Sequence, residues 1–111
     1  MTEPELAKPE PIEPTPPKAG DFYYHYKHNP ELDLMNFCYM VIGTAIHTET
    51  EEILIIYKPV YRTDFLKEKR ADFFARPLAM FLEKVVIDGV STSRFSKITD
   101  SKIIQIIKNK T

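Results

Sequence analysis

The stretch of residues 37–47 (FCYMVIGTAIH) constrains the fold more than any other part of the chain. Its odd and even positions are both largely apolar, so a strand here would bury both of its faces. Gly43 lies inside the stretch, where a β-bulge or a sharp bend is the usual reason for a glycine. We therefore predict a central strand that is covered on two sides.

Two hairpins are predicted after the start of this strand. Residues 52–58 form a returning strand behind a polar turn at residues 47–51, which is longer than the two-residue turns. Residues 84–87 and 90–95 flank the dipeptide Asp88-Gly89. A type I′ turn needs positive φ at both of its central residues, and Asp-Gly is one of the dipeptides that adopt such values readily.

The remaining predicted elements are short. Residues 22–27 are rich in β-formers and predict a first strand. Residues 60–62 are expected to continue as an edge strand after Pro59. Pro77 suits the first position of a short helix. Residues 101–108 could form a strand or an amphipathic helix, and so short an apolar run leaves both open.

Together these elements predict a mostly β domain over residues 21–98, a small, partly open SH3-like barrel with five or six strands and one short helical turn. Residues 1–20 hold six of the nine prolines. They predict a disordered Pro/Glu-rich arm, because few apolar groups are present to offset the entropy of ordering. Its PxxP spacing fits either a solvated linker or a ligand for an aromatic groove. Residues 99–111 form a C-terminal extension.

Charge and cysteine content limit the classes of function. Residues 21–100 contain 10 Lys and Arg against 12 Asp and Glu, so nucleic acid is an unlikely partner, since it favours a basic stripe. The single cysteine, Cys38, lies in an apolar run and is expected in the core. A free thiol and the lack of a signal peptide indicate the cytoplasm, and no stretch is long enough to span a membrane. Without a glycine-rich loop, no cofactor is expected.

Several short motifs occur in a distinctive order. They are His25-Tyr26-Lys27, His47-Thr48-Glu49-Thr50, Ile55 with Tyr57, Tyr61, Arg76-Pro77, Phe81 and Arg94-Phe95. This order resembles the bacterial domain-of-unknown-function 1653 family, which reads HYKG, HSET, VxYxxLYG, WVRPxxxF and PRF over about residues 23–98. The chain departs at His28, where the family has glycine, and at Ser93, where it tends to have proline. The resemblance implies a fold and a shared surface, but no activity.

The main hypothesis for function is a non-enzymatic binding module for a peptide or another extended ligand. Exposed tyrosines in SH3-type domains form a groove that receives such a ligand. Six tyrosines are many for burial, since each buried hydroxyl needs a partner, so we expect two or three to be at least half exposed. The inserted loops 28–36 and 63–72 are expected to flank the groove. The predicted ligand-binding residues are Tyr24, Tyr26, Lys27, Tyr57, Tyr61 and Arg76.

Two alternatives stay open. A small hydrolase or metal-assisted enzyme would use His25, His47 and Glu49, since a histidine–carboxylate pair is the minimal general base. The spacing matches no metal motif, so we expect no metal site, and a turn-capping network at His47 and Glu49 is the favoured interpretation. Single-stranded RNA binding, by rings and neighbouring cations, is the other alternative.

Strand alternation separates the residues of the first motif. Tyr24 and Tyr26 share one face of the predicted strand, and His25 and Lys27 share the opposite face. Only one of these faces can belong to a given site, and we favour the tyrosine face. At the other end of the chain, an isoleucine cluster is a candidate contact for a weak homodimer, because exposed apolar patches usually mark partners. The cluster consists of Ile103, Ile104, Ile106 and Ile107.

Overall fold

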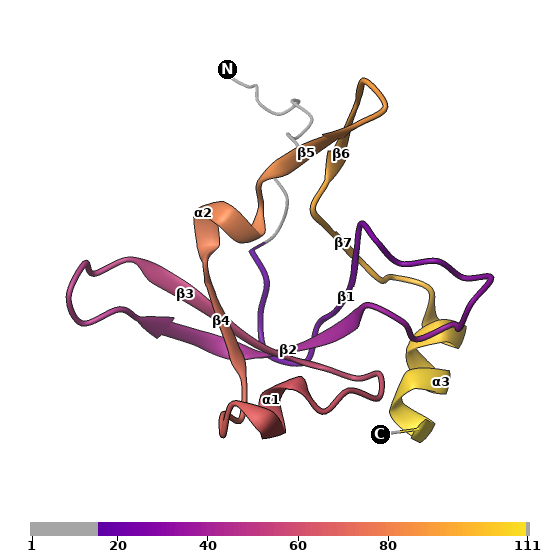
Figure 1. Ribbon diagram of the computed structural model, residues 1–111, viewed down its shortest axis with the longest axis horizontal. Helices are drawn as coiled ribbons and strands as arrows, with labels where there is room; N and C mark the ends of the chain where they lie inside the picture. Colours follow the sequence, from indigo (N-terminus) through magenta and orange to yellow (C-terminus); the bar gives the residue numbers. More distant parts are fainter. Residues whose placement is uncertain (1–15, 111) are drawn as a thin grey trace, which may run out of the picture.

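The computed structural model describes residues 16–110 and confirms a small, mostly β domain (Figure 1). Within these residues, five strands form an antiparallel sheet in the order β4-β3-β2-β1-β7, and β5 pairs with β6 in a separate hairpin. The strands are β1 (Phe22–His25), β2 (Cys38–Ile46), β3 (Ile53–Pro59), β4 (Phe74–Pro77), β5 (Lys84–Ile87), β6 (Val90–Ser93) and β7 (Phe95–Lys97). The helices are α1 (Phe65–Glu68), α2 (Leu78–Phe81) and α3 (Ser101–Lys110). Residues 1–15, most of the predicted arm, lie outside the described part of the chain.

Strand β2 is the long central strand that its apolar pattern predicts. It pairs with β1 through Phe22↔Met40 and with β3 along nearly its whole length. The register shifts between Val41 and Gly43, so the glycine does mark an irregularity in the ladder. The shift also changes which positions of β2 face which side of the sheet.

Each face of the sheet carries its own apolar cluster. One cluster consists of Tyr23, Tyr39, Val41, Ile55, Tyr57, Phe81 and Phe95. The other consists of Phe22, Met35, Cys38, Ile98 and Ile107, with Ile103 and Ile104 of α3 packed against it. Neighbouring residues of β1 and β2 alternate between the two clusters, as the pleat requires. Cys38 is completely buried, which confirms its predicted place in the core.

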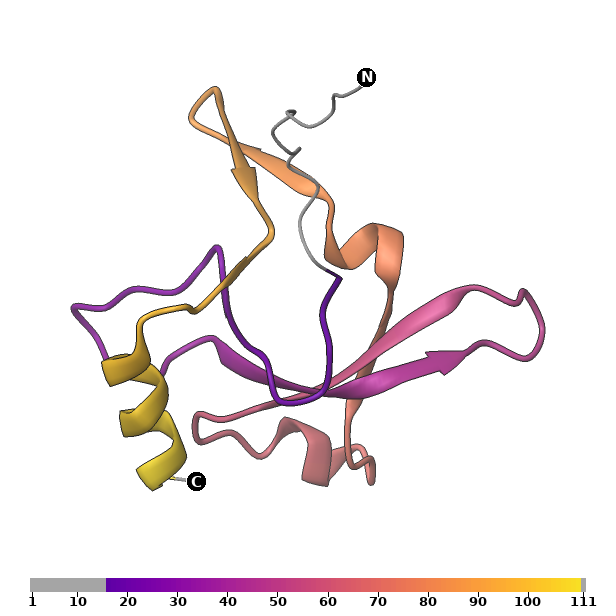
Figure 2. The ribbon, with the colours of Figure 1, turned by 180° about the vertical axis from the view of Figure 1, so that it is seen from behind.

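The five-stranded sheet does not close into a barrel. Its edges, β4 and β7, pair only with β3 and β1 among the described residues. The β5–β6 hairpin projects away from the sheet in both views (Figures 1 and 2). Asp88 and Gly89 at its turn have φ of 51° and 80°, the two positive values that the dipeptide predicts.

Two predicted elements differ from the structure, and one open choice is resolved. Residues 60–62 form no edge strand: Val60 and Tyr61 make a bend, and the edge strand beside β3 is β4 instead. Residues 90–95 divide into β6 and β7, since Arg94 leaves the ladder and its N–H donates to the Glu83 carbonyl instead. The predicted two-way choice at residues 101–108 is resolved as the helix α3. None of the described helices is long and apolar enough to cross a membrane.

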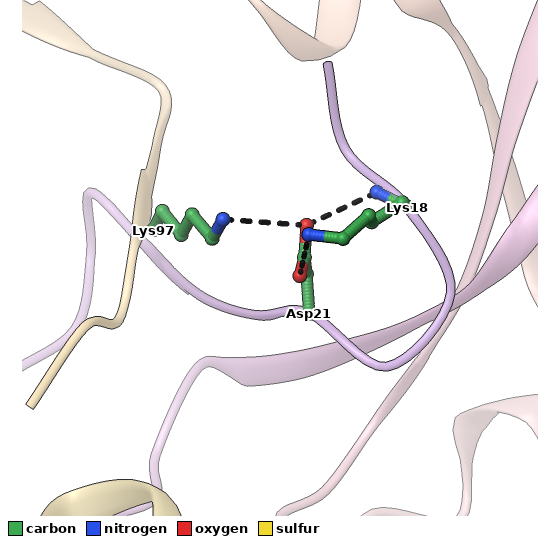
Figure 3. Close-up of polar contacts among 3 residues, drawn as sticks. All are labelled: Lys18, Asp21 and Lys97. Carbon is green, nitrogen blue, oxygen red and sulfur yellow. Dashed lines mark hydrogen bonds and ion pairs between the residues drawn. The ribbon is translucent and has the colours of Figure 1, made fainter. Parts of the chain in front are cut away.

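The segment that leads into β1 is tied to the sheet by Asp21 (Figure 3). The Asp21 carboxylate pairs with Lys18 at 3.4 Å and with Lys97 of β7 at 3.7 Å. The Gly20 N–H donates to the Val41 carbonyl at 2.9 Å, and Pro17 is buried. Residues 17–21 are therefore fixed to the sheet, and the arm begins from an anchored base.

Candidate functional site

A cleft of about 260 Å³ lies on the sheet face that carries the Tyr39 and Tyr57 cluster. All five strands of the main sheet contribute to it, either from within the strand or from an adjoining residue. The lining residues are His25, Lys27, Phe37, Tyr39, Tyr57, Phe74, Arg76 and Phe95. The open sheet therefore gathers one surface from residues that are far apart in the sequence.

Three buried rings form the floor of the cleft. Tyr39, Tyr57 and Phe95 are each at most 8% exposed, and their ring centroids lie 5.5 to 6.0 Å apart in edge-to-face arrangements. Phe74 and Phe37 are half-buried and extend the aromatic surface towards solvent. This geometry, in which each ring meets its neighbour edge-on, is the favourable one for aromatic clusters.

Arg76 is held over this floor by two contacts. Its Nε donates to the Tyr57 hydroxyl at 3.2 Å, and its guanidinium carbon lies 5.6 Å from the centroid of the Phe95 ring. Because Arg76 belongs to β4 and Phe95 to β7, the side chain links the two open edges of the sheet. The terminal guanidinium nitrogens form no hydrogen bond or ion pair with any described residue and can bind an oxyanion in a bidentate manner.

His25 lines the cleft as a neutral hydrogen-bond donor. The Lys27 backbone N–H donates to its Nδ1 at 3.1 Å, so the proton of the neutral ring is on Nε2. The pKa of His25 is lowered from its usual 6.5 to about 4, mainly by burial and in smaller part by the nearby charges of Lys27, Arg76 and Arg94. Both causes disfavour the charged imidazolium, so the ring is neutral at neutral pH.

No carboxylate balances the cations of the cleft. None of the eight lining residues is Asp or Glu. Neither Lys27 nor Arg76 forms an ion pair with another described residue, whereas Arg94 nearby pairs with Glu83 at 3.3 Å. A guanidinium and an ammonium without ion-pair partners and a neutral imidazole donor, placed beside aromatic rings, are groups that can hold an oxyanion attached to an apolar group.

The structure brings three of the six predicted ligand-binding residues into this cleft. These are Lys27, Tyr57 and Arg76. Tyr61 lies beside it, where its hydroxyl is 3.0 Å from that of Tyr39. Tyr26 packs against the His25 ring but does not line the cleft. Tyr24 belongs to the opposite face, packed against the α3 cluster and stacked on His28 at 3.8 Å.

The face of β1 that carries His25, rather than the one that carries Tyr24, therefore faces the cleft. The expectation that two or three tyrosines are at least half exposed is also wrong, because all six are buried or half-buried. Two of them solve the problem of a buried hydroxyl by bonding: Tyr39 with Tyr61, and Tyr57 with Arg76. Burial raises the pKa of Tyr39 well above its ordinary value, so its hydroxyl stays protonated.

His47 and Glu49 lie in the turn between β2 and β3, away from the cleft lining. His47 Nδ1 accepts the backbone N–H groups of Glu49 at 3.1 Å and Thr50 at 3.3 Å. The Thr50 hydroxyl in turn donates to Glu52 at 3.0 Å. This is the turn-capping network that the sequence favours over a general base. In the described chain, no group of three or more His, Cys, Asp or Glu is placed to hold a metal ion.

Sequence reasoning missed Phe37, Tyr39 and Phe95 as site residues. A partial signal was present in the two inserted loops, which were expected to flank the groove. Phe37 directly follows loop 28–36, and Phe74 comes just after loop 63–72. The first loop is held by an amide network in which Asn36 bonds the backbone of Asn29.

The isoleucines of the predicted homodimer contact mostly belong to the domain's own core. Ile107 is completely buried, and Ile103 and Ile104 pack against the cluster around Cys38. Ile106 is 39% exposed. A homodimer through these residues stays a prediction, and Ile106 would have to make most of its contact.

Comparisons with known proteins confirm the family resemblance of the sequence. A family described as "Protein of unknown function (DUF1653)" matches residues 21–97. A crystal structure of a protein belonging to the same family, from Bordetella bronchiseptica, superposes with a TM-score of 0.52 at 24% identity and covers 73% of this chain and 86% of that chain. This second likeness concerns the fold alone. No curated protein matches the chain.

Proposed function

We propose, from the premise that the chain belongs to the DUF1653 family, that it is a non-enzymatic binding module of SH3-like type. Its ligand is an extended peptide that carries a carboxylate next to an apolar side chain. The observation that supports this proposal is the pairing of unbalanced cations with aromatic rings in one cleft. The buried Cys38 thiol supports a reducing compartment, the cytoplasm, as its location.

The rings and the cations of the cleft suit the two parts of such a ligand. Aromatic rings receive apolar or proline side chains of extended peptides, whose low backbone entropy favours binding. Arg76, already oriented by Tyr57 and Phe95, offers the two terminal nitrogens of its guanidinium to a carboxylate. Lys27 adds a second charge at the exposed rim. The volume of about 260 Å³ lies just below the usual range of small-ligand pockets, which suits a short part of a peptide.

The chemistry of the cleft supports binding over catalysis. Its lining contains no thiol, serine hydroxyl or carboxylate to act as nucleophile or base. His25, the one imidazole there, has a pKa of about 4, which makes it a weak base at neutral pH. A peptide ligand also fits the acidic charge of the domain better than a polynucleotide, whose phosphates would meet that charge along their length.

Titration of the full chain with synthetic peptides tests this function. The probes are capped peptides in which glutamates alternate with prolines or with phenylalanines, and the control peptides carry lysine for glutamate. We expect the amide signals of His25, Lys27 and Arg76 in 15N NMR spectra to shift with the acidic peptides only. Shifts caused instead by a short oligouridylate would support the single-stranded RNA alternative. No shift with either probe, or equal shifts with the lysine peptides, would contradict the proposal.

A further inference from the structure

The strongest unused feature of the sequence is the composition of residues 1–15. They contain four glutamates and one lysine, and three of the glutamates directly precede a proline, at Glu3-Pro4, Glu10-Pro11 and Glu13-Pro14. Each pair places a carboxylate next to an apolar ring. This is the ligand chemistry that the cleft selects, since its rings accept a proline and its cations accept a carboxylate.

From this match we propose that the cleft receives a Glu-Pro pair of the protein's own N-terminal arm, from the same molecule. The inference deepens the proposed function and rests on it, because the arm would then be a tethered competitor of an external peptide. Charge complementarity supports it: residues 1–15 carry a formal charge of −3 from side chains, from one Lys and four Glu, whereas the cleft presents Lys27 and Arg76 without a partnering acid.

The three Glu-Pro pairs lie at different distances along the chain from the anchored segment. The arm leaves from residue 16, next to the anchored segment that Asp21 ties to β7 (Figure 3). At about 3.1 Å per residue, the prolines at positions 14, 11 and 4 can extend about 6, 16 and 37 Å from there. The longest of these distances is close to 40 Å, the intermediate of the three principal extents of the molecule. The three pairs therefore cover a wide range of distances from the anchor.

Tethering makes a weak contact effective. A single carboxylate and a single proline ring give low affinity when free in solution, because association entropy must be overcome. A short connection supplies an effective concentration in the millimolar range, which favours contact within one molecule over contact between molecules. Release of the arm would then make the cleft available to an external ligand.

Paramagnetic NMR on the full chain tests the contact. A nitroxide is attached at Ala7→Cys, between the first two Glu-Pro pairs, since Cys38 is completely buried. We expect the amide signals of His25, Lys27 and Arg76 to lose intensity relative to the same sample with the nitroxide reduced. Unchanged intensities at these three residues would overturn the inference.

Two variants of the arm identify what the cleft recognises. In one, Glu3, Glu10 and Glu13 are replaced by glutamine; in the other, Pro4, Pro11 and Pro14 are replaced by alanine at unchanged charge. Both should restore the signal intensities. If the proline variant leaves the intensity loss intact, the contact is general attraction between charges, and the inference is wrong.

Two further measurements separate this inference from the proposed function. A mixture of spin-labelled, unenriched chain with unlabelled 15N chain should show no intensity loss, and a loss there would overturn the assignment to the same molecule. The glutamine variant should bind the external glutamate–proline peptide about two- to tenfold more tightly, in proportion to the freed fraction of the cleft. Equal binding by both chains would contradict a role for the arm while leaving the binding module intact.

Discussion

His25, the last residue of β1, and His47, just after β2, make the same local hydrogen bond in different surroundings. Each accepts at Nδ1 the backbone N–H of the residue two positions later, Lys27 in one case and Glu49 in the other. His25 is enclosed by aromatic rings and three cations, whereas His47 lies in a turn whose other polar groups bond one another. The same motif therefore lines a cleft in one place and caps a turn in the other, and the tertiary neighbours decide which.

The largest expected difference between the two regions is in ligand binding. Arg76→Gln removes the charge next to His25, and we expect it to lower the affinity for the glutamate–proline peptide about 10- to 100-fold, the scale of a lost charge-assisted hydrogen bond. Isothermal titration calorimetry measures the affinity. Glu49→Gln in the turn is the matched control and should leave it unchanged.

Because Arg76 also contacts Tyr57 and Phe95, loss of folding must be separated from loss of binding. Lys27→Gln provides that separation, since Lys27 is exposed and its side chain bonds no described residue. It should weaken the peptide severalfold with the melting temperature unchanged. Full affinity in both variants would refute the assignment of the site.

The next largest difference is in how pH affects stability. The pKa of His25 is about 4 in the folded protein and near 6.5 when unfolded, so the unfolded state binds more protons between these values. The contribution of the neutral ring is complete above pH 6.5 and is lost as the pH falls towards 4. We expect a loss on the order of 1–2 kcal/mol in this window, less than the full shift because the ring is partly exposed to solvent.

Urea denaturation at several pH values measures this contribution. His25→Gln should flatten the pH dependence in the window, and His47→Gln should leave it in place. The external peptide should also raise the pKa of His25, because a bound carboxylate favours the imidazolium form. A pH dependence that is kept in His25→Gln and lost in His47→Gln would contradict the different roles given to the two histidines.

A smaller effect is expected at the hydroxyl that orients Arg76. Tyr57→Phe removes the acceptor for Arg76 Nε, and we expect it to lower the free energy of unfolding by about 1 kcal/mol, a typical value for one hydrogen bond. Tyr24→Phe is the matched control, because the Tyr24 hydroxyl bonds no described residue. Thermal denaturation of the two variants side by side makes the measurement, and equal losses would contradict the role given to Tyr57.

The smallest effect is expected in the turn between β2 and β3. His47→Ala removes the acceptor of two exposed backbone N–H groups, which water can partly replace, so the loss should stay below about 1 kcal/mol. Thr48→Ala, next to it and exposed, is the reference for any general effect on the turn. A loss at His47 larger than that of Tyr57→Phe would reverse the ranking of the two regions.

Local patterns in the sequence were sufficient for several elements. The two-sided apolar pattern of residues 37–47 placed β2, and Asp88-Gly89 placed the β5–β6 turn, because each depends on neighbours close in sequence. The edge strand β4 was expected only as an extended stretch, since its place beside β3 depends on pairing such as Ile55↔Arg76 across the intervening loop. The alternation of side chains between the two faces of β1 was also predicted correctly, but the sequence could not show which of these faces lines the cleft.

The site was harder to predict than the fold for the same physical reason. Its walls come from five strands, and the tyrosines that were expected to be exposed are buried because hydroxyls find partners on other strands, as in Tyr39 with Tyr61. A single sequence gives residue types but not these pairings. Lys27, Tyr57 and Arg76 were identified from their chemistry, and Phe95 was not, because a phenylalanine in a core and one in a cleft look alike in sequence.

The position of Cys38 has a practical consequence. It is the only cysteine in the chain, it has no exposed surface, and burial raises its pKa to about 12. A thiol-reactive dye added to the native protein can therefore react only during moments when the cluster around Cys38 opens. The rate at which the dye reacts therefore reports how often this cluster opens, and it can be measured on the unmodified protein.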